Sequence, residues 1–382
     1  MTPRSTRLHT AMAVRRVAKK SAPTQKVVPT ATRIVNPVMP TPVSIPMELN
    51  PTEQLNTKLR NGTLFEYIVF WLTTYKRGTI KQTSYDTLEK TAYTYIQNSI
   101  GPITFGRVCS DDIQRLITHM KEDEGYSYST CKKVYDCLHA AIKHAVKRKV
   151  LSENPMELVE MPGKALFETK EVSFYDVREC SLIIEEAMRL YSNGKPVYVY
   201  GDAIILILLT GLRLGEALGL AKDDFDRERR VLKVRRNVAN VRNRDEEGNL
   251  LPGRNLQLTT TKTYSGYREL PLTSQAVAAI ERMIKRNPYS PYIINSSKGE
   301  MAAPEQIDRT FRRLLANIGL ESAGVHKLRH TFASILFASQ KTDIKTISRL
   351  LGHASPTITL MVYIHIAETI PYEAITPLDE MF

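Results

Sequence analysis

The sequence of 382 residues contains few cysteines, and none of them is placed for a metal site or a redox pair. Cys109, Cys131, Cys137 and Cys180 form no CxxC motif, and no histidine stands beside them at a spacing that suits zinc. The chain also lacks a GxxxxGK[ST] phosphate loop and an HExxH pair, the usual motifs of NTP hydrolysis and zinc proteolysis. We therefore interpret the cysteines as reduced thiols of a cytosolic protein, and we expect no metal and no cofactor.

Long apolar runs are missing as well. The longest, AIILILLTGL at 203–212, is shorter than the roughly 20 residues that span a bilayer. The N-terminus has no continuous apolar segment of the kind found in secretory signals. Positive charge, in contrast, is in excess: 53 Lys and Arg against 40 Asp and Glu give a net charge of +13. This balance favours a polyanionic partner, nucleic acid before an anionic membrane surface.

The N-terminal segment, residues 1–55, is predicted to be a disordered basic arm. Its first 50 residues carry eight Lys and Arg against a single acid, Glu48, and they contain recurring prolines but no aromatic residue. Such a composition cannot bury a core. Mitochondrial transit peptides are also Arg-rich and poor in acids, and composition alone leaves that alternative open.

Residues 56–160 are predicted to form a helical domain. Its first helix opens with a capping box made by Thr63 and Glu66. Hydrophobic periodicity predicts helices at about 63–76, 82–98, 110–122 and 128–149. Basic residues surround the apolar stripe of the last helix and are candidate DNA phosphate contacts: Lys132, Lys133, Lys143, Lys147 and Arg148.

A linker is predicted at 161–172, next to the Pro- and Gly-containing stretch NPMELVEMPGK, and a second domain at 173–366. Helical patterns at 175–191 and 197–210 come first in this domain. Three strands are then expected in RVLKVRRNVANVR, NLQLTTTKT and YRELPL, with turns at DEEGN and YSGY. From about residue 304 the pattern is helical again.

Four short segments of the second domain combine residues suited to phosphate chemistry. In TGLRLGE, Gly211 is expected to end a helix and to place Arg213 at the start of the next, one turn before Glu216. Lys262 precedes a tight turn between two strands. Each feature alone has an ordinary explanation, an exposed ion pair or a solvated hairpin lysine.

The other two segments lie near the C-terminus. In VHKLRHTFAS, His326, Arg329 and His330 share one helix face because they are three and four positions apart. In DIKTISRLLGHASPTITLMVYIH, Asp343 is expected to cap a helix that Gly352 ends, with His353 just beyond it. Tyr363 follows two turns into the next predicted helix.

In this order, TGLRLGE, the hairpin lysine, HKLRHT and LLGH…VYIH resemble the signature of the tyrosine recombinase (phage integrase) family. The ten-residue step from His353 to Tyr363 is similar to integrases of conjugative transposons. The resemblance covers about 63–370. It implies a mainly α fold with a small antiparallel β-sheet, in which a helical core-binding domain and an α+β catalytic domain hold a DNA duplex. It also implies these catalytic residues: Arg213, Lys262, His326, Arg329, His353 and Tyr363.

The resemblance implies that Tyr363 attacks a scissile phosphate and forms a 3′-phosphotyrosyl bond, without metal or ATP. A phenol has a pKa of about 10, so it needs help to lose its proton. His326 would handle that proton and Lys262 would protonate the leaving 5′-oxygen. Arginine forks suit the nonbridging oxygens. Glu216 is expected to orient Arg213, and His330 to support the site.

The implied partners are double-stranded DNA attachment sites and three further copies of the chain in a homotetramer on DNA, with an excision factor and a host DNA-bending protein as possible additions. The place of action would be the bacterial cytoplasm, and no membrane partner is expected. Residues 367–382 are predicted to pack on a neighbouring protomer. Residues 1–50 depart from the family because they show no strand pattern of a folded arm-binding domain. Two alternatives remain: relaxation of DNA by a type IB topoisomerase, and a catalytically inactive DNA-binding protein on the same fold.

Overall fold

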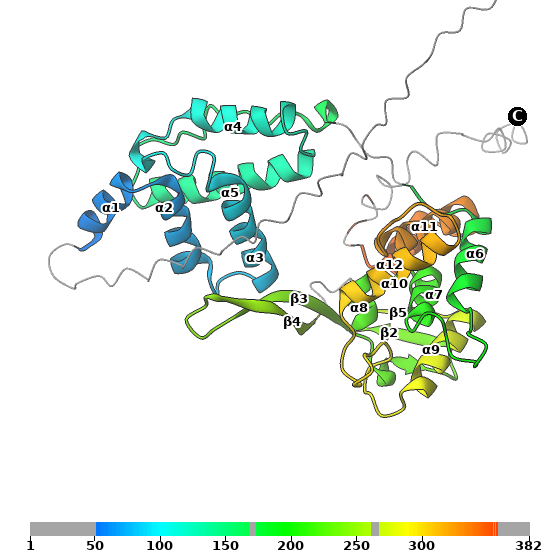
Figure 1. Ribbon diagram of the computed structural model, residues 1–382. Helices are drawn as coiled ribbons and strands as arrows, with labels where there is room; N and C mark the ends of the chain where they lie inside the picture. The colour runs from blue at the N-terminus through cyan, green and yellow to red at the C-terminus, as the bar shows by residue number, and fades with distance from the viewer. Residues whose placement is uncertain (1–50, 168–172, 261–266, 354, 356, 358–382) are drawn as a thin grey trace, which may run out of the picture. The chain divides into compact units, whose positions relative to one another are not determined.

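The computed structural model describes residues 51–167, 173–260, 267–353, 355 and 357 (Figure 1). Two large clusters of buried apolar side chains form within them. One belongs to a helical region, residues 51–167, and the other to a mixed region, residues 173–353. A small third cluster joins α11 (His326–Ala338) and α12 (Ile344–Leu351) of the mixed region. The docking tail predicted at 367–382 and most of the arm predicted at 1–55 lie outside the described residues. Residues 51–55 of that arm are described and helical, so the prediction of disorder is wrong for them.

The helical region is built from helices and short helical turns. In chain order these are α1 (Pro51–Asn61), α2 (Leu64–Trp71), η1 (Leu72–Lys76), α3 (Gln82–Thr91), η2 (Ala92–Ile96), η3 (Phe105–Arg107), α4 (Ser110–Glu122), α5 (Tyr128–Lys147) and η4 (Lys164–Leu166). The four helices expected from periodicity are confirmed. The structure adds α1, which begins at Pro51, five residues before the predicted start of the domain. None of its residues is fully buried, and its apolar face is limited to Leu55 and Leu59, of which Leu59 packs against the helical core, so the sequence signal is weak.

Local sequence explains where these helices start and what they bury. Thr63 accepts a hydrogen bond from the Glu66 amide at 3.1 Å, and the Glu66 carboxylate accepts one from the Thr63 amide at 2.8 Å, so the predicted capping box is confirmed. On α5 the expected core stripe, which includes Val134, Leu138 and Ile142, is fully buried. The core then extends past residue 160, since Phe167 is buried against Tyr128, with ring centroids 5.4 Å apart.

The mixed region surrounds a central apolar helix with further helices and two small sheets. Its helices are α6 (Val177–Ala187), α7 (Gly201–Thr210), α8 (Leu214–Leu218), η5 (Lys222–Asp224), α9 (Ser274–Arg286), α10 (Pro304–Asn317), α11 (His326–Ala338) and α12 (Ile344–Leu351). Nearly every residue of α7 is buried, as expected of a helix that is apolar all round. The mainly α fold with small antiparallel sheets is confirmed.

The strands are β1 (Phe225–Asp226), β2 (Val231–Val234), β3 (Arg236–Arg244), β4 (Leu250–Thr260) and β5 (Arg268–Pro271). One antiparallel sheet has the order β1-β2-β5, and β3 pairs with β4 as a hairpin. The run RVLKVRRNVANVR is therefore divided between two sheets, a partner choice that local alternation does not encode. The turn expected at DEEGN closes the hairpin, where Asp245 accepts a hydrogen bond from the Asn249 amide at 2.7 Å.

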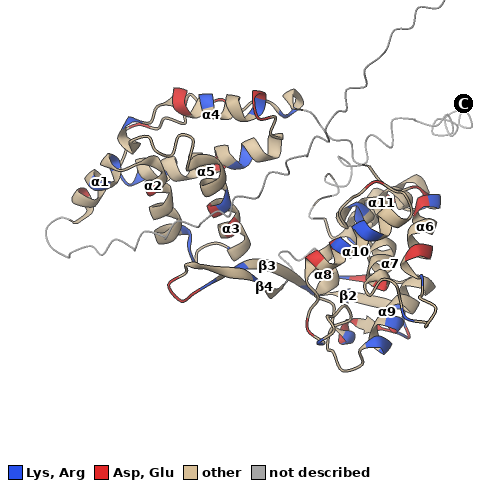
Figure 2. Cartoon of the chain, in the orientation of Figure 1, with Lys and Arg blue, Asp and Glu red and all other residues tan. Residues whose placement is uncertain are grey.

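Charge is mixed on the surface of both regions. Figure 2 shows acidic and basic residues interspersed on α4 and on α6. Among the described residues, no helix combines the length and the apolar character required to cross a membrane.

Candidate active site

The C-terminal end of α12 is the point on which the predicted site residues converge. Asp343 caps the start of this helix by accepting a hydrogen bond from the Thr346 amide at 2.9 Å. Gly352 ends it in the left-handed conformation, with φ at +66°, as the sequence predicts. The last carbonyls of a helix have no partner within it, and they form the negative end of its dipole. The carbonyl oxygens of 350–352 are thus ready acceptors for cationic donors.

Arg213 is placed at this helix end by the start of α8. Its amide donates to the Glu216 carboxylate at 3.0 Å, and its Nη1 donates to the same carboxylate at 2.8 Å. The guanidinium also reaches the carbonyls of Leu351 and Gly352, at 3.5 and 3.3 Å. Glu216 thus contacts both the backbone and the guanidinium of Arg213.

Arg329 approaches the same carbonyl from α11. Its Nη2 donates to the Leu351 carbonyl at 2.8 Å and its Nη1 to the Gly211 carbonyl at 2.7 Å. Only 3% of Arg329 is exposed. The two arginines of the predicted phosphate site therefore meet at Leu351, although 116 positions separate them in the chain (213 to 329).

Gly211 makes this arrangement possible at the end of α7. Its φ is +64°, and a Cβ atom at this position would lie 2.4 Å from the Phe332 ring. The prediction that Gly211 ends a helix is confirmed, and the structure adds a second reason for glycine, because Phe332 of α11 packs directly on its Cα.

Arg268, on β5, is a residue of this cluster that the sequence analysis did not identify. Its Nε donates to the Leu350 carbonyl at 2.7 Å, and Nη1 and Nη2 donate to the two oxygens of Glu216 at 3.2 and 2.8 Å. The alternation of the strand could have identified it, because Arg268 lies two positions before Leu270 and therefore on the same strand face. The structure shows that both residues are buried. A charged residue at an inward position of a strand usually has a buried partner.

The carboxylate of Glu216 is the counter-charge for both Arg213 and Arg268. Burial alone would raise its pKa, but the hydrogen bonds and charge of Arg268, together with the charge of Arg213, outweigh burial. The pKa of Glu216 is therefore lowered, and the carboxylate stays ionised.

Three histidines border the arginines. The rings of His326 and His330 meet edge to face, with centroids 4.8 Å apart. Partial desolvation and the charges of Arg329 and Arg213 lower the pKa of His326. Burial, His326 and Arg329 lower the pKa of His330 to about 4. For His353, burial and then Arg329, Arg213, Arg268 and His330 lower the pKa to about 4.

Burial is the main cause of the lowered histidine pKa values, and the charges of the nearby arginines add to it, a positive local field that favours an anion. Neutral imidazoles in such a field can accept a proton or donate a hydrogen bond. The arginine forks add donors for phosphate oxygens. Among the described residues, no cluster of His, Cys, Asp and Glu side chains is arranged to hold a metal ion.

Two of the six predicted catalytic residues, Lys262 and Tyr363, lie outside the described residues. The candidate DNA contacts on α5 have different surroundings. Lys133, Lys143 and Lys147 are exposed, and Lys132 is paired with Asp136.

Arg148, the remaining candidate DNA contact, lies over the rings of Phe70 and Tyr75. It donates hydrogen bonds to the Tyr75 hydroxyl and, at 3.3 Å, to Asn56. These contacts indicate that Arg148 holds the helical region together.

Two family descriptions match the chain. Residues 63–162 match the phage integrase SAM-like domain, and residues 181–369 match the phage integrase family. The chain belongs to the phage integrase family of tyrosine recombinases. This recombinase is similar to a XerC-like tyrosine recombinase of Caldanaerobacter subterraneus subsp. tengcongensis. The two are 28% identical over 86% of this chain and 85% of the relative.

Solved structures with the same fold include two integrases in complex with DNA. The Tn1549 transposon integrase in complex with circular intermediate DNA matches with a TM-score of 0.65 and 21% identity, over 84% of the recombinase and 100% of that chain. A lambda integrase tetramer bound to a Holliday junction matches with a TM-score of 0.59 and 18% identity, over 81% and 83%.

Proposed function

We propose that this tyrosine recombinase cleaves and rejoins duplex DNA at specific sites with Tyr363 as its nucleophile, and thereby integrates or excises a mobile element. The observation that carries the proposal is the convergence of Arg213, Arg329 and His353 at the end of α12, ten residues before Tyr363. Two arginine forks and neutral histidines in a positive field suit a phosphodiester.

The reaction balances with this chain's own residues. The Tyr363 oxygen bonds to the scissile phosphorus while the bond from phosphorus to the 5′-oxygen breaks. His326 takes the phenol proton, for which its lowered pKa keeps the imidazole neutral at pH 7. Lys262 protonates the departing 5′-oxygen. Arg213, Arg329 and His353 donate to the nonbridging oxygens, and a 5′-hydroxyl of another strand reverses the steps to rejoin DNA without ATP.

The proposed assembly is a homotetramer on paired attachment sites. It is supported by the fold shared with the tetrameric lambda integrase on a Holliday junction and with the Tn1549 integrase on DNA. The proposed functional divisions are an arm that ends before α1, a helical domain that extends to the buried Phe167, a linker and a catalytic domain at 173–366. Residues 367–382 are proposed to dock on a neighbouring protomer, and the bacterial cytoplasm is the proposed compartment.

The test uses nicked suicide duplexes from the ends of the element that encodes the gene. Wild type, Tyr363→Phe and the control Tyr289→Phe are incubated with them without metal or ATP, and the products are separated on denaturing gels. Tyr289 is 96% exposed, so its substitution should be neutral. Wild type and the control should form a protease-sensitive adduct on the 3′ side of the nick, and Tyr363→Phe should bind DNA without forming it.

Adduct formation by Tyr363→Phe would refute the nucleophile assignment. The family match favours recombination over the topoisomerase alternative. Metal-free relaxation of a supercoiled plasmid that lacks the attachment sites, without recombination of plasmids that carry them, would reverse that preference. DNA binding with no adduct from any variant would support the inactive DNA-binding alternative.

A further inference from the structure

We infer that Arg268 is a positioning residue of the recombination site, which holds Arg213 and the helix end before His353 in their working places. The inference rests on the proposed function of Arg213 and His353. In this role Arg268 acts through other residues, because it is 9% exposed and its guanidinium donates to the Leu350 carbonyl and the Glu216 carboxylate.

The contacts of Arg268 connect three separate elements. From β5 it donates one hydrogen bond to the Leu350 carbonyl of α12 and two to the Glu216 carboxylate of α8. Glu216 in turn accepts from both the amide and the guanidinium of Arg213. A displacement of Arg268 is therefore transmitted to Arg213 through one carboxylate, and to His353 through three residues of backbone.

Only an arginine can make this connection. The planar fork presents Nε to one acceptor and the two Nη groups to a carboxylate at the same time. A lysine would preserve the charge but would offer one ammonium to two acceptors on different elements. Arg268 is also the first residue of β5 and stands six residues after Lys262, the predicted lysine of the site.

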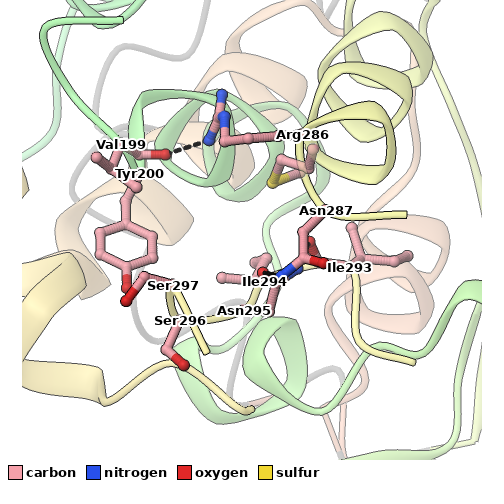
Figure 3. A pocket seen from close by; sticks show the side chains of 10 residues that line it. Val199, Tyr200, Arg286, Asn287, Ile293, Ile294, Asn295, Ser296 and Ser297 are labelled. Carbon is pink, nitrogen blue, oxygen red and sulfur yellow. Dashed lines mark hydrogen bonds between the residues drawn. The ribbon is translucent and has the colours of Figure 1, made fainter. Parts of the chain in front are cut away.

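Arg286 offers a matched control. It also bonds to a buried carboxylate, that of Asp202 at 2.7 Å, and to one backbone carbonyl, that of Val199 (Figure 3). Its partners lie on α7 and in the preceding loop, beside a pocket that Asn287 also lines. Arg268→Lys and Arg286→Lys thus make the same chemical change at an arginine bonded to a buried carboxylate and a backbone carbonyl. The Arg286 side chain is more exposed, at 35% against 7% for Arg268, and only Arg268 contacts the cluster at α12.

The experiment has two readouts on the full chain. Hydrogen exchange of the free protein measures protection of the Gly352 and His353 amides, which donate to the Arg349 and Ser348 carbonyls. Single-turnover cleavage of the suicide duplex at saturating DNA measures the chemical step. We expect Arg268→Lys to speed exchange at both amides about tenfold and to slow cleavage about 100-fold. The Kd for DNA should stay within about twofold of wild type.

A double substitution separates positioning from a general loss of stability. If Arg268 acts through Arg213, adding Arg268→Lys to Arg213→Lys should slow cleavage far less than Arg268→Lys does alone. Arg286→Lys should leave both readouts near wild type. Wild-type exchange and cleavage in Arg268→Lys, fully multiplicative rate losses in the double variant, or equal losses in Arg286→Lys would each overturn the inference.

Failure of the proposed function has a different signature. If wild type forms no Tyr363-dependent adduct on any substrate, the cleavage chemistry is wrong. Exchange at Gly352 and His353 in Arg268→Lys against Arg286→Lys still decides whether Arg268 positions the helix end.

Discussion

The arginines at the end of α12 and the exposed lysines of α5 hold positive charge in opposite ways. In the mixed region, Arg213, Arg268 and Arg329 are fixed by a carboxylate and by backbone carbonyls at one helix end. In the helical region, Lys133 and Lys143 project from α5 into solvent. The first arrangement specifies direction and distance, and the second supplies charge alone. Substitutions that keep charge but change shape should therefore separate the regions.

The largest effect is expected at Arg213. Arg213→Lys keeps the charge but loses the fork, so single-turnover cleavage should fall by about 100-fold or more. Lys143→Arg, the reverse change on α5, should cleave at a near-normal rate because only charge is required there. Suicide-substrate gels measure both, and near-normal cleavage by Arg213→Lys would remove it from the phosphate site.

Backbone geometry should show the next largest effect. Gly211→Ala forces a side chain into a left-handed conformation and against Phe332, which should lower the free energy of unfolding by about 3 kcal/mol. Gly194 has a similar φ of +73° but open space around it, so Gly194→Ala should lose only about 1 kcal/mol. Urea titrations compare the two variants. Equal losses would show that Phe332 gives way without strain.

Substitution of the exposed lysines should have a smaller effect, on the salt dependence of DNA binding. Each of Lys133→Gln, Lys143→Gln and Lys147→Gln should reduce the slope of log K against log salt by about 0.9 if that lysine contacts a phosphate. Fluorescence anisotropy at several salt concentrations gives the slopes. Arg148→Gln should instead lower stability, because its guanidinium bonds to Tyr75 and Asn56. Unchanged slopes in all three lysine variants would place the DNA-binding face elsewhere.

The smallest effect is expected from pH. His330 and His353 have pKa values of about 4 in the folded chain, below the ordinary 6.5, so the unfolded chain binds protons first as pH falls. Their contribution to stability is complete above pH 6.5 and is lost as pH falls toward 4. The urea midpoint should decline between pH 6.5 and 5, and less in His330→Gln. An identical decline in that variant would contradict the burial of His330.

Residues that obey local rules were predictable from sequence. Gly211 and Gly352 end helices as left-handed glycines, and Asp343 and Thr63 cap the helices that follow them. The shared helix face of His326, Arg329 and His330 follows from spacing alone. Each of these predictions needs information from fewer than ten neighbouring residues.

The remainder depends on contacts between distant segments. Every residue has a backbone carbonyl, so nothing in the sequence marks those of 350–352 as acceptors. Their hydrogen bonds with Arg213, Arg268 and Arg329 could therefore not be predicted. The same holds for Arg148, whose charge is directed inward at aromatic rings contributed by earlier helices. The role of an exposed charged side chain can be predicted from composition. The role of a charged side chain that is held by other residues can be predicted only when its partners in the fold are known.

The use of backbone carbonyls as acceptors has an evolutionary consequence. Because the arginines are held by main-chain atoms of Leu350, Leu351 and Gly352, replacing either leucine side chain leaves the acceptor oxygens in place. Positions 350 and 351 can then change to other apolar residues that still fill the core, where Leu351 is buried, while the acceptor oxygens of the anion site stay in place. Side-chain identity therefore matters for the site at the donors and at Gly352, whose left-handed conformation favours glycine, and much less at positions 350 and 351.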